Sequence, residues 1–310
     1  MLYSKLTRLI KRKISQWRSR PKRLAVELTN RCNLNCPFCL VGLQDNQDSV
    51  AHDALQRDRG RMKLELAGKV IKDAKDFGMT EILLTFQGEP LLHSEILDFI
   101  GLCKKYQMKS ILFTNGMLLN PAKSYRLIHA GLDSIQFSVD GATQEVYSQN
   151  RVGGNFDTVF KNMRDIVTMA RNHKSDMSIV WQFIVLRNNE HQVELAKQLA
   201  DEIGIRLILK TFAESVPELA PLNEKYRRNL QMKPCTDIYR CPAVLWNGDV
   251  VPCCYDIEGK EVMGNIRNTS FLELWKSERY CKFRDSVSDV LNFPENDPGL
   301  CKTCLKWKQP

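Results

Sequence analysis

The segment Asn30-Arg31-Cys32-Asn33-Leu34-Asn35-Cys36-Pro37-Phe38-Cys39 places three cysteines at the spacing Cys-x3-Cys-x2-Cys, directly after a strand-like run at 24–29. Thiolates are soft ligands that suit iron–sulfur clusters, and a 4Fe-4S cluster takes four ligands. Three cysteines in one short loop therefore predict a 4Fe-4S cluster with one iron left open. A structural zinc site is the alternative, but such sites usually take paired cysteines and fill all four positions. We favour the iron–sulfur cluster.

The cysteine spacing and the aromatic residue before the last cysteine resemble the cluster loop of the radical S-adenosylmethionine (SAM) superfamily. The resemblance implies that Cys32, Cys36 and Cys39 bind the cluster. It also implies that the open iron chelates the amino and carboxylate groups of the methionine part of SAM. Phe38 is then expected to pack beside the adenine, although shielding of the cluster would explain an aromatic residue there equally well.

The composition is that of a globular protein. Its 310 residues are 43% hydrophobic, enough for one large domain and a smaller one. No apolar run approaches the length of about 18 residues that a membrane span needs, and the N-terminus lacks the apolar core of a signal peptide. We therefore expect a cytoplasmic protein, in which eleven cysteines indicate metal or redox chemistry rather than disulfides.

The net charge of +9 comes from the first 23 residues, which hold nine Lys and Arg residues and no acid. We expect residues 1–23 to form a basic amphipathic helix that lies on an anionic membrane surface or docks on the protein by its apolar face. Nucleic-acid binding is not expected, because no basic stripe continues elsewhere. The apolar residues that recur there at helical spacing are Leu2, Leu6, Leu9, Ile10, Ile14 and Trp17.

Residues 62–210 alternate between helical and strand-like patterns. The strand-like runs are too continuously apolar to have a solvent-exposed face, which is typical of parallel sheets covered by helices. About six strand–helix units predict an α/β fold, a partial (β/α)6 barrel of the radical SAM type. Chemistry in such folds lies at the carboxyl ends of the strands, where the cysteine loop falls. The predicted helices cover 62–77, 94–107, 121–130, 156–171 and 190–203, and the predicted strands 24–29, 81–86, 110–113, 134–139, 178–186 and 206–209.

The segment Phe86-Gln87-Gly88-Glu89-Pro90 ends the second predicted strand. It resembles the Gly-Gly-Glu-Pro motif of the radical SAM superfamily, which carries the amino group of SAM, with Gln87 in place of the first glycine. Glu89 is able to accept a charge-assisted hydrogen bond from that ammonium group, and Gly88 allows the backbone to approach the ligand closely.

Polar residues follow the later strands as well. The resemblance implies that Asn115, Ser138 and Asp140 line the SAM pocket, where Ser138 would bond a ribose hydroxyl or the methionine carboxylate. Arg151 would pair with that carboxylate, and Asn188 would lie near the adenine. Each residue alone is also explained as an ordinary turn residue that caps a strand. Their recurrence at successive strand ends favours the binding role.

A second group of cysteines occupies the last quarter of the chain, beyond a linker predicted at 211–234 by three prolines. Asn247-Gly248 is a strong hairpin signal, so that Cys253 follows the returning strand and can meet the C-terminal Cys-x2-Cys pair. We expect residues 235–310 to form a small domain of their own. The cysteines of this group are Cys235, Cys241, Cys253, Cys254, Cys281, Cys301 and Cys304.

The runs 246–256, 264–266 and 301–304 resemble the SPASM-type C-terminal extension of radical SAM enzymes. The resemblance implies one auxiliary 4Fe-4S cluster, and its best ligand set is Cys235, Cys253, Cys301 and Cys304, with Cys254 the alternative to Cys253. A zinc ribbon made from the same cysteines is the alternative site. Cys241, Cys254 and Cys281 are expected to be buried thiols. In the alternative, Cys254 or Cys241 donates a hydrogen atom to a substrate radical. Cys103 is expected in the core.

The family resemblance implies that one electron cleaves SAM into methionine and a 5'-deoxyadenosyl radical, which abstracts hydrogen from the substrate. We expect a carbohydrate or lipid-linked glycan substrate, epimerised or oxidised, because a basic amphipathic N-terminus favours a substrate presented at a membrane. A peptide maturase is the second hypothesis, and a non-catalytic Fe-S redox or sensor protein the third. The expected partner is an electron donor such as flavodoxin or ferredoxin.

Overall fold

The computed structural model describes residues 20–43, 55–212, 216–227 and 235–288, together with Cys301 and Cys304. The basic helix predicted for residues 1–23 lies almost entirely outside the described residues. At its end the prediction is wrong, because Pro21 and Lys22 are not helical and Arg23 begins a strand. Proline lacks the backbone N–H that a helix interior needs. Among the described residues, none of the helices combines the length and the apolar character needed to cross a membrane.

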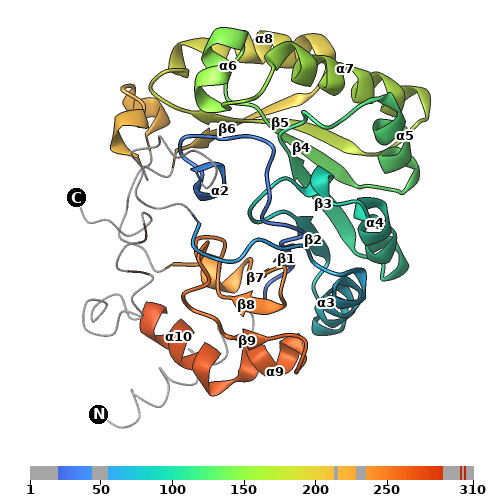
Figure 1. Cartoon of the computed structure of the whole chain (residues 1–310), viewed down its shortest axis with the longest axis vertical. Coiled ribbons are helices and arrows are strands. Elements are labelled where there is room, and N and C mark those ends of the chain that lie inside the picture. Colours follow the sequence, from blue (N-terminus) through green and yellow to red (C-terminus); the bar gives the residue numbers. More distant parts are fainter. Residues whose placement is uncertain are drawn as a thin grey trace, which may run out of the picture.

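Nine strands form one curved sheet in the order β6-β5-β4-β3-β2-β1-β7-β8-β9 (Figure 1). The first six strands run parallel, each beside the next in the chain. The predicted partial parallel barrel is therefore confirmed. These strands are β1 Arg23–Val26, β2 Glu81–Leu84, β3 Lys109–Thr114, β4 Ser134–Ser138, β5 Ser178–Val185 and β6 Arg206–Thr211.

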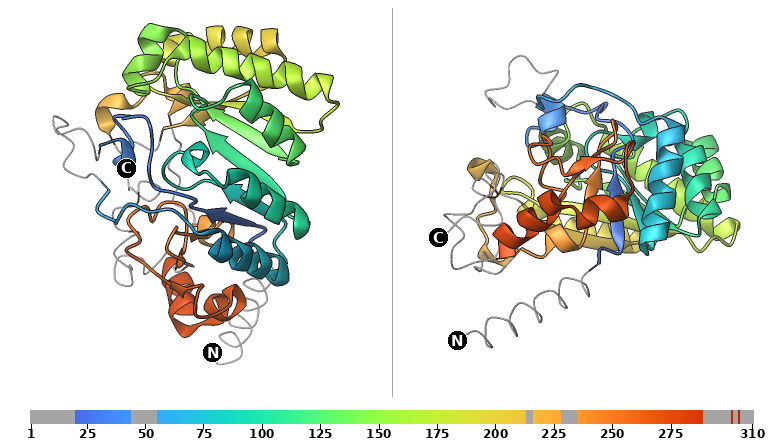
Figure 2. Two further views of the ribbon diagram at one scale, coloured as in Figure 1. Left: turned by 45° about the vertical axis from the view of Figure 1, so that its right-hand side comes forward. Right: turned by 90° about the horizontal axis from the view of Figure 1, so that it is seen from below.

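Five main helices follow the strands in chain order around the outside of the sheet (Figures 1 and 2). Their apolar stripes pack on the strands around fully buried residues such as Phe99, Phe137 and Trp181. Local sequence fixes their ends: the Asn155 side chain accepts the Thr158 N–H at the start of α7, and Gly204 ends α8 at a φ of +71°. The helices are α3 Leu64–Phe77, α4 Ile96–Lys105, α5 Pro121–His129, α7 Phe156–Asn172 and α8 Val193–Ile203.

The C-terminal part continues the same sheet. β7 Ala243–Val244 pairs parallel to β1, and β8 Asp249–Val251 and β9 Gly264–Asn265 follow in antiparallel order. The predicted hairpin at Asn247-Gly248 is confirmed, with Gly248 at a φ of +94°. Figure 2 shows the last two helices at the end of the sheet remote from α8, where Phe271 contacts Phe77 of α3 with ring centroids 5.0 Å apart. They are α9 Phe271–Lys276 and α10 Glu278–Ser288.

Short elements that the sequence pattern does not predict connect these parts. α6 spans Gln144–Asn150 between β4 and α7, and α2 spans Leu40–Leu43 directly after the cysteine loop. Both are too short to show the apolar repeat of a helix. The 3-10 helices are η1 Pro90–Leu92, η2 Glu190–Gln192, η3 Pro217–Leu219, η4 Glu224–Tyr226 and η5 Asp237–Tyr239.

Candidate functional site

A pocket lies at the carboxyl ends of β1 to β4, where the sequence predicts the chemistry. The three cysteines of the N-terminal loop line it together with predicted SAM-binding residues from three other strand ends. The parallel sheet therefore brings together residues that lie more than 100 positions apart in the chain. The lining residues are Cys32, Leu34, Cys36, Cys39, Thr85, Gly88, Glu89, Phe113, Thr114, Asn115, Ser138 and Arg151.

The cysteine loop is anchored at its middle. Leu34 is buried, and the Asn35 N–H donates to the Val152 carbonyl oxygen over 2.9 Å. Burial raises the pKa of the Cys32 thiol from 9.0 to about 12, and the negative charges of Glu89 and of the other two loop cysteines raise it further. Without metal, this thiol is therefore protonated at neutral pH and loses its proton on ligation.

The donor set fits an iron–sulfur cluster. Three thiols face one pocket, and no other cysteine of the described residues lines it. The polar groups around them are carboxylate, amide and hydroxyl groups at strand ends, which are suited to a polar ligand. Cys32, Cys36 and Cys39 would hold the cluster, and the strand ends would hold the ligand of its open iron.

Gly88 occupies a position that only glycine tolerates. Its φ is +77°, and a Cβ atom there would lie 2.5 Å from the Thr29 carbonyl oxygen and 2.6 Å from the Arg31 carbonyl oxygen. The next backbone N–H, that of Glu89, donates to the Arg31 carbonyl oxygen over 2.8 Å. The segment after β2 is therefore pressed against the segment that leads into the cysteine loop.

The Glu89 carboxylate is fixed by three donors. Its Oε1 accepts hydrogen bonds from the Leu91 N–H (3.0 Å) and the Thr114 hydroxyl (2.8 Å), and its Oε2 accepts one from the Asn115 N–H (2.8 Å). Burial raises the pKa of this carboxyl group, and the same hydrogen bonds oppose the shift. Oε2 has a single donor and therefore keeps a lone pair for a further one.

Asn115 and Ser138 lie on the pocket wall as predicted. The Asn115 side-chain N–H groups lie 2.9 Å from the Asn33 Oδ1 atom and 3.9 Å from the Cys32 Sγ atom. Ser138 ends β4 and is half-buried. Asn115 therefore contacts the cysteine loop directly, in addition to facing the pocket.

Arg151 and Asp140 form a buried ion pair. The Nε and Nη2 atoms of Arg151 lie 2.8 and 2.6 Å from the Asp140 Oδ2 atom, and the Asp140 Oδ1 atom accepts the Ile184 N–H over 2.7 Å. Asp140 is fully buried and is not among the described lining residues, so it stands behind Arg151. The Nη1 atom of Arg151 lies 3.7 Å from the Cys36 Sγ atom. This pairing links a strand end to a thiol of the loop.

The two residues expected near adenine lie outside that lining. Phe38 packs edge-on against Phe212, with ring centroids 6.0 Å apart, and the Arg151 guanidinium lies 5.5 Å from its ring centroid. The Asn188 side chain donates to the Asn150 Oδ1 atom over 2.9 Å, and its own Oδ1 atom is buried without a hydrogen-bond partner. That oxygen remains available as an acceptor.

Several cysteines of the C-terminal group interact with one another. Burial raises the pKa of the Cys253 thiol, and the thiols of Cys254, Cys235 and Cys304 raise it further. Cys301 is buried, and the Cys304 N–H donates to its carbonyl oxygen over 3.1 Å. Within the described ranges, no three His, Cys, Asp or Glu side chains are grouped as ligands of a single metal ion.

The remaining cysteines differ in burial. Cys103 is fully buried in α4, as predicted. The expectation of a buried thiol is wrong for Cys254, which is exposed, although Cys253 beside it is buried. Cys241 and Cys281 are half-buried, and the Cys281 Sγ atom lies 3.3 Å from the Nη2 atom of Arg284.

The sequence analysis missed an ion pair beside the site, between Glu27 and Arg57. Glu27 is fully buried directly after β1, and its two carboxylate oxygens lie 2.9 and 2.7 Å from the Nη1 and Nη2 atoms of Arg57. Arg57 also donates to the Ile257 carbonyl oxygen over 2.7 Å, and the Trp246 N–H donates to Glu27 over 3.2 Å. The one sign of this ion pair in the sequence was Glu27 itself, an acidic residue within the apolar strand predicted at 24–29. A buried charge needs a partner, so such a residue indicates that one exists.

The sequence profile of the Radical SAM superfamily matches residues 26–199, and that of the SPASM iron–sulfur cluster-binding domain matches residues 235–305. The chain belongs to the radical SAM superfamily. It is therefore an enzyme of the radical SAM class that uses a 4Fe-4S cluster and SAM, with an auxiliary iron–sulfur domain at its C-terminus.

Curated relatives of this radical SAM protein differ in how much of its chain they align with. The tungsten-containing aldehyde ferredoxin oxidoreductase cofactor-modifying protein of Pyrococcus furiosus is 26% identical over 91% of this chain and 88% of its own length. The PqqA peptide cyclase of Gluconobacter oxydans is 27% identical over 60% of this chain. A probable GTP 3',8-cyclase of Methanococcus maripaludis is 28% identical over 63% of it. The chain spans 48% of the peptide cyclase and 60% of the GTP cyclase.

Solved structures share the fold. SuiB of Streptococcus suis bound to SAM is 15% identical, with a TM-score of 0.70 over 99% of this chain and 81% of that chain. BtrN in complex with AdoMet and 2-DOIA is 20% identical, with a TM-score of 0.58 over 92% of each chain. Both likenesses extend over the barrel and the C-terminal domain.

Proposed function

We propose that this radical SAM enzyme acts on a peptide and abstracts a hydrogen atom from a carbon of one of its residues. The observation that carries the proposal is the recurrence of peptides in both comparisons: PqqA peptide cyclases among the relatives, and SuiB bound to precursor peptide SuiA among the structures, with a TM-score of 0.65. A third fold neighbour is anSMEcpe with a bound Cp18Cys peptide. The comparisons give the predicted glycan substrate no such support, so the second hypothesis of the sequence analysis replaces it.

The open sheet supports an extended substrate. β6 is an edge strand, and β5 is the one described strand that pairs with it, so no described strand occupies its other edge. Peptides bind to such edges by adding a strand. Phe212, next after β6, contacts Phe38 of the cysteine loop, which places this edge close to the site.

The residues of the cluster pocket have separate roles in the proposal. Cys32, Cys36 and Cys39 would hold the cluster, which when bound would supply the electron for cleavage of SAM into methionine and a 5'-deoxyadenosyl radical. Glu89 receives the ammonium group of SAM on its Oε2 atom, and Gly88 lets this segment lie close to the loop. Asn115 and Ser138 orient the rest of the ligand.

Arg151 acts on the cluster rather than on the carboxylate of SAM. Asp140 already pairs with its guanidinium and fixes its position, while its Nη1 atom faces the Cys36 Sγ atom. A charged N–H donor stabilises electron density on the sulfur of a reduced cluster, which raises the reduction potential. Asp140 is thus a positioning residue, and Asn188 offers its unpaired oxygen to the adenine amino group.

Cys235, Cys253, Cys301 and Cys304 bind the auxiliary cluster in this proposal. Cys254 is exposed beside Cys253, and an exposed thiol is accessible to a substrate radical. Oxidation of the product radical through the auxiliary cluster and hydrogen donation by Cys254 lead to different products. The first removes two hydrogen atoms from the peptide, and the second inverts a centre without a change of mass.

The test uses the full chain, reconstituted anaerobically with iron and sulfide and supplied with SAM and dithionite. Synthetic peptides encoded beside its gene and a lipid-linked oligosaccharide fraction are offered separately, and 5'-deoxyadenosine and substrate mass are measured. We expect a peptide to stimulate 5'-deoxyadenosine formation and to change in mass or take up solvent deuterium. Stimulation by the oligosaccharide fraction alone would restore the glycan hypothesis. A loaded cluster that never yields 5'-deoxyadenosine would favour the sensor hypothesis.

A further inference from the structure

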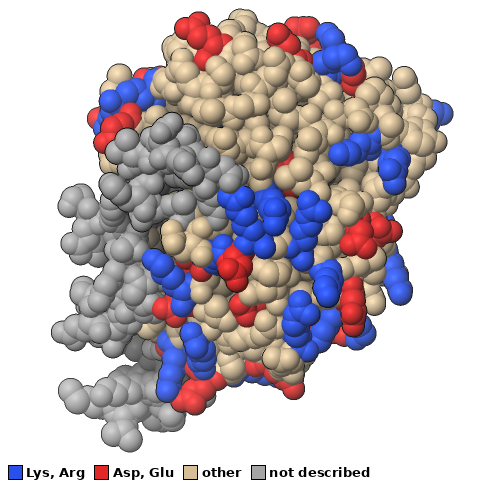
Figure 3. Space-filling model, in the orientation of Figure 1, with Lys and Arg blue, Asp and Glu red and all other residues tan. Residues whose placement is uncertain are grey.

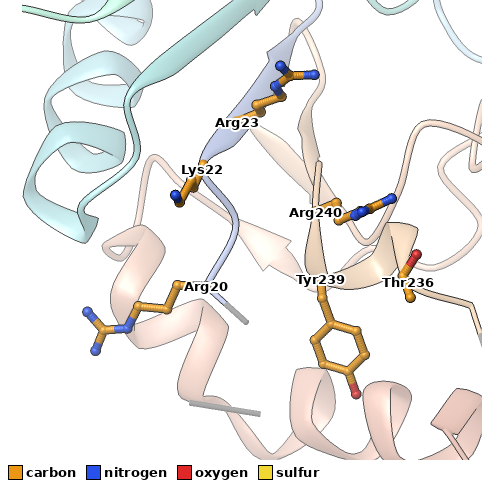
Figure 4. Close-up of a pocket in the computed structure, with 6 residues that line it drawn as sticks. All are labelled: Arg20, Lys22, Arg23, Thr236, Tyr239 and Arg240. Atoms are coloured by element: carbon orange, nitrogen blue, oxygen red, sulfur yellow. The ribbon is translucent and has the colours of Figure 1, made fainter. Parts of the chain in front are cut away.

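A cationic hollow lies at the amino end of β1, opposite the end that carries the cluster pocket. Its volume is about 630 Å³, and Figure 4 shows the side chains around it. Of the six described lining side chains, four are cationic and none is acidic. They come from two segments, the approach to β1 and the short stretch that contains η5. The lining residues are Arg20, Lys22, Arg23, Thr236, Tyr239 and Arg240.

Two of these cations have no acidic partner. Lys22 and Arg240 are exposed and form no ion pair with any described residue, whereas Arg23 pairs with Glu81 over 2.5 Å. Some cations elsewhere on the surface sit beside acids, as Lys104 does beside Asp133 over 2.7 Å. In Figure 3, basic and acidic side chains lie side by side over the lower half of the face in view. Among the described residues, the positive charges of Lys22 and Arg240 therefore have no acidic counterpart at the hollow.

The cations point apart rather than toward one centre. In Figure 4 the guanidinium groups of Arg20 and Arg240 lie on opposite sides of the hollow, and Arg23 points in a third direction. A single phosphate group is bound by donors that converge on it. Diverging cations around an open hollow instead match a broad acidic protein surface.

The hollow also borders the auxiliary cysteines. Thr236 on its rim follows Cys235 directly, and Arg240 directly precedes Cys241. The charge of Arg23 acts on the Cys241 thiol and opposes the rise of its pKa through burial. A redox protein docked in the hollow would therefore lie one residue from a proposed ligand of the auxiliary cluster.

We propose that this hollow docks an acidic one-electron carrier protein, with a flavin or iron–sulfur group, whose electron would pass through the auxiliary cluster to the SAM cluster. The inference rests on the proposed function in taking Cys235 as a cluster ligand. Opposite charges steer such encounters and speed association at low ionic strength. The hollow lies away from the mouth of the SAM pocket, so carrier and substrate bind without competing.

The experiment compares the full reconstituted enzyme with the variant Lys22→Glu/Arg240→Glu. SAM cleavage is followed as 5'-deoxyadenosine, once with dithionite and once with a reduced acidic flavodoxin as sole reductant. We expect the variant to need about tenfold more flavodoxin for half-maximal rate at low salt, with an unchanged dithionite rate. The difference between wild type and variant shrinks as salt is added.

Arg126→Glu/Lys174→Glu is the matched control. Both residues are exposed, on α5 and after α7, and their substitution changes the net charge equally. An equal loss in the control, or no loss in the hollow variant, overturns the proposal. The proposal is also overturned if the hollow variant loses binding of inorganic phosphate or of phosphatidylglycerol vesicles while reduced flavodoxin still supports its normal rate of SAM cleavage. Failure with dithionite in the wild type would instead count against the proposed function.

Discussion

The surroundings of Arg151 support the proposed role at the cluster. Its motif position suggests a partner for the SAM carboxylate, but its guanidinium is paired with Asp140 and faces the sulfur of Cys36. The three partners come from the cysteine loop, the end of β4 and the start of the segment before α7. Sequence spacing identifies each of them as polar and near a strand end, but it does not say which pairs with which.

Removing the ion pair tests the effect of Arg151 on the cluster. The variant Asp140→Asn/Arg151→Gln avoids an unpaired buried carboxylate, which would itself destabilise the protein. A hydrogen bond to a charged group contributes about 1.5–3 kcal/mol, so we expect the reduced-to-oxidised ratio of the SAM cluster at a fixed potential to fall about tenfold or more. Redox titration followed by electron paramagnetic resonance measures it. Arg151→Lys keeps the charge and serves as control, and an unchanged ratio in the double variant would contradict the assignment.

The raised pKa of the Cys32 thiol predicts that the stability of the protein without its clusters depends on pH. Its pKa is raised from 9.0 to about 12 in the folded state, so this contribution to stability is complete below pH 9 and is lost as pH rises toward 12. We expect the free energy of unfolding to fall by about 1 kcal/mol between pH 8 and pH 10 from this group. Urea unfolding of the apo protein measures the fall. Cys32→Ser should show a smaller one, and equal slopes would refute the prediction.

At the scale of elements, the strand ends are what the site depends on. The sequence predicts all six barrel strands and five of its helices, because their apolar repeats are long. It places the end of β2 two residues late, since Thr85 and Phe86 are as apolar or β-branched as the strand itself. The structure ends the strand there because the chain turns to bring Gly88 against the segment before the cysteine loop.

Gly88 and Gly68 make a matched pair for testing that contact. In Gly88→Ala the new Cβ atom would lie 2.5 Å from the Thr29 carbonyl oxygen at a φ of +77°, whereas at Gly68, inside α3, the nearest atom is 4.0 Å away. We expect Gly88→Ala to lose about 1–3 kcal/mol of stability and most of its iron at the SAM cluster. Gly68→Ala should gain about 0.5–1 kcal/mol with full iron content. Urea unfolding and iron analysis decide, and normal iron in Gly88→Ala would show that the contact is dispensable.

At the scale of the whole molecule, the C-terminal domain is built onto the barrel through one sheet. Pairing of β7 with β1 could not be predicted, because more than 200 residues separate two short strands of ordinary composition. The cysteines of the N-terminal loop stand out in the sequence because their spacing is local, whereas the proposed C-terminal set spans 235–304. The placement of the two groups depends on that long-range pairing, which puts the hairpin after β7 next to the strand that leads to the N-terminal loop.

Iron content tests the two-cluster organisation. The fully reconstituted protein should bind about eight irons per chain, and Cys253→Ser about four, because each 4Fe-4S cluster accounts for four. Cys103→Ser changes a fully buried cysteine of α4 and should keep about eight. Iron and zinc are measured together on the same samples. About four irons and one zinc per wild-type chain would instead establish the zinc ribbon at the C-terminal cysteines.

The Glu27–Arg57 pair holds three parts of the molecule together, since it joins the end of β1, the segment before α3 and the Ile257 carbonyl group of the C-terminal domain. Glu27 is fully buried, so Arg57→Gln leaves its carboxylate without a counter-charge, which costs about 3–5 kcal/mol. Glu27→Gln/Arg57→Gln removes both charges, and we expect it to recover most of that loss of stability. Urea unfolding of the two variants gives the difference, and hydrogen exchange at 243–251 reports whether the C-terminal strands loosen in Arg57→Gln alone. If the double variant is as unstable as Arg57→Gln, the contacts of Arg57 with the C-terminal domain, rather than its charge, stabilise the junction.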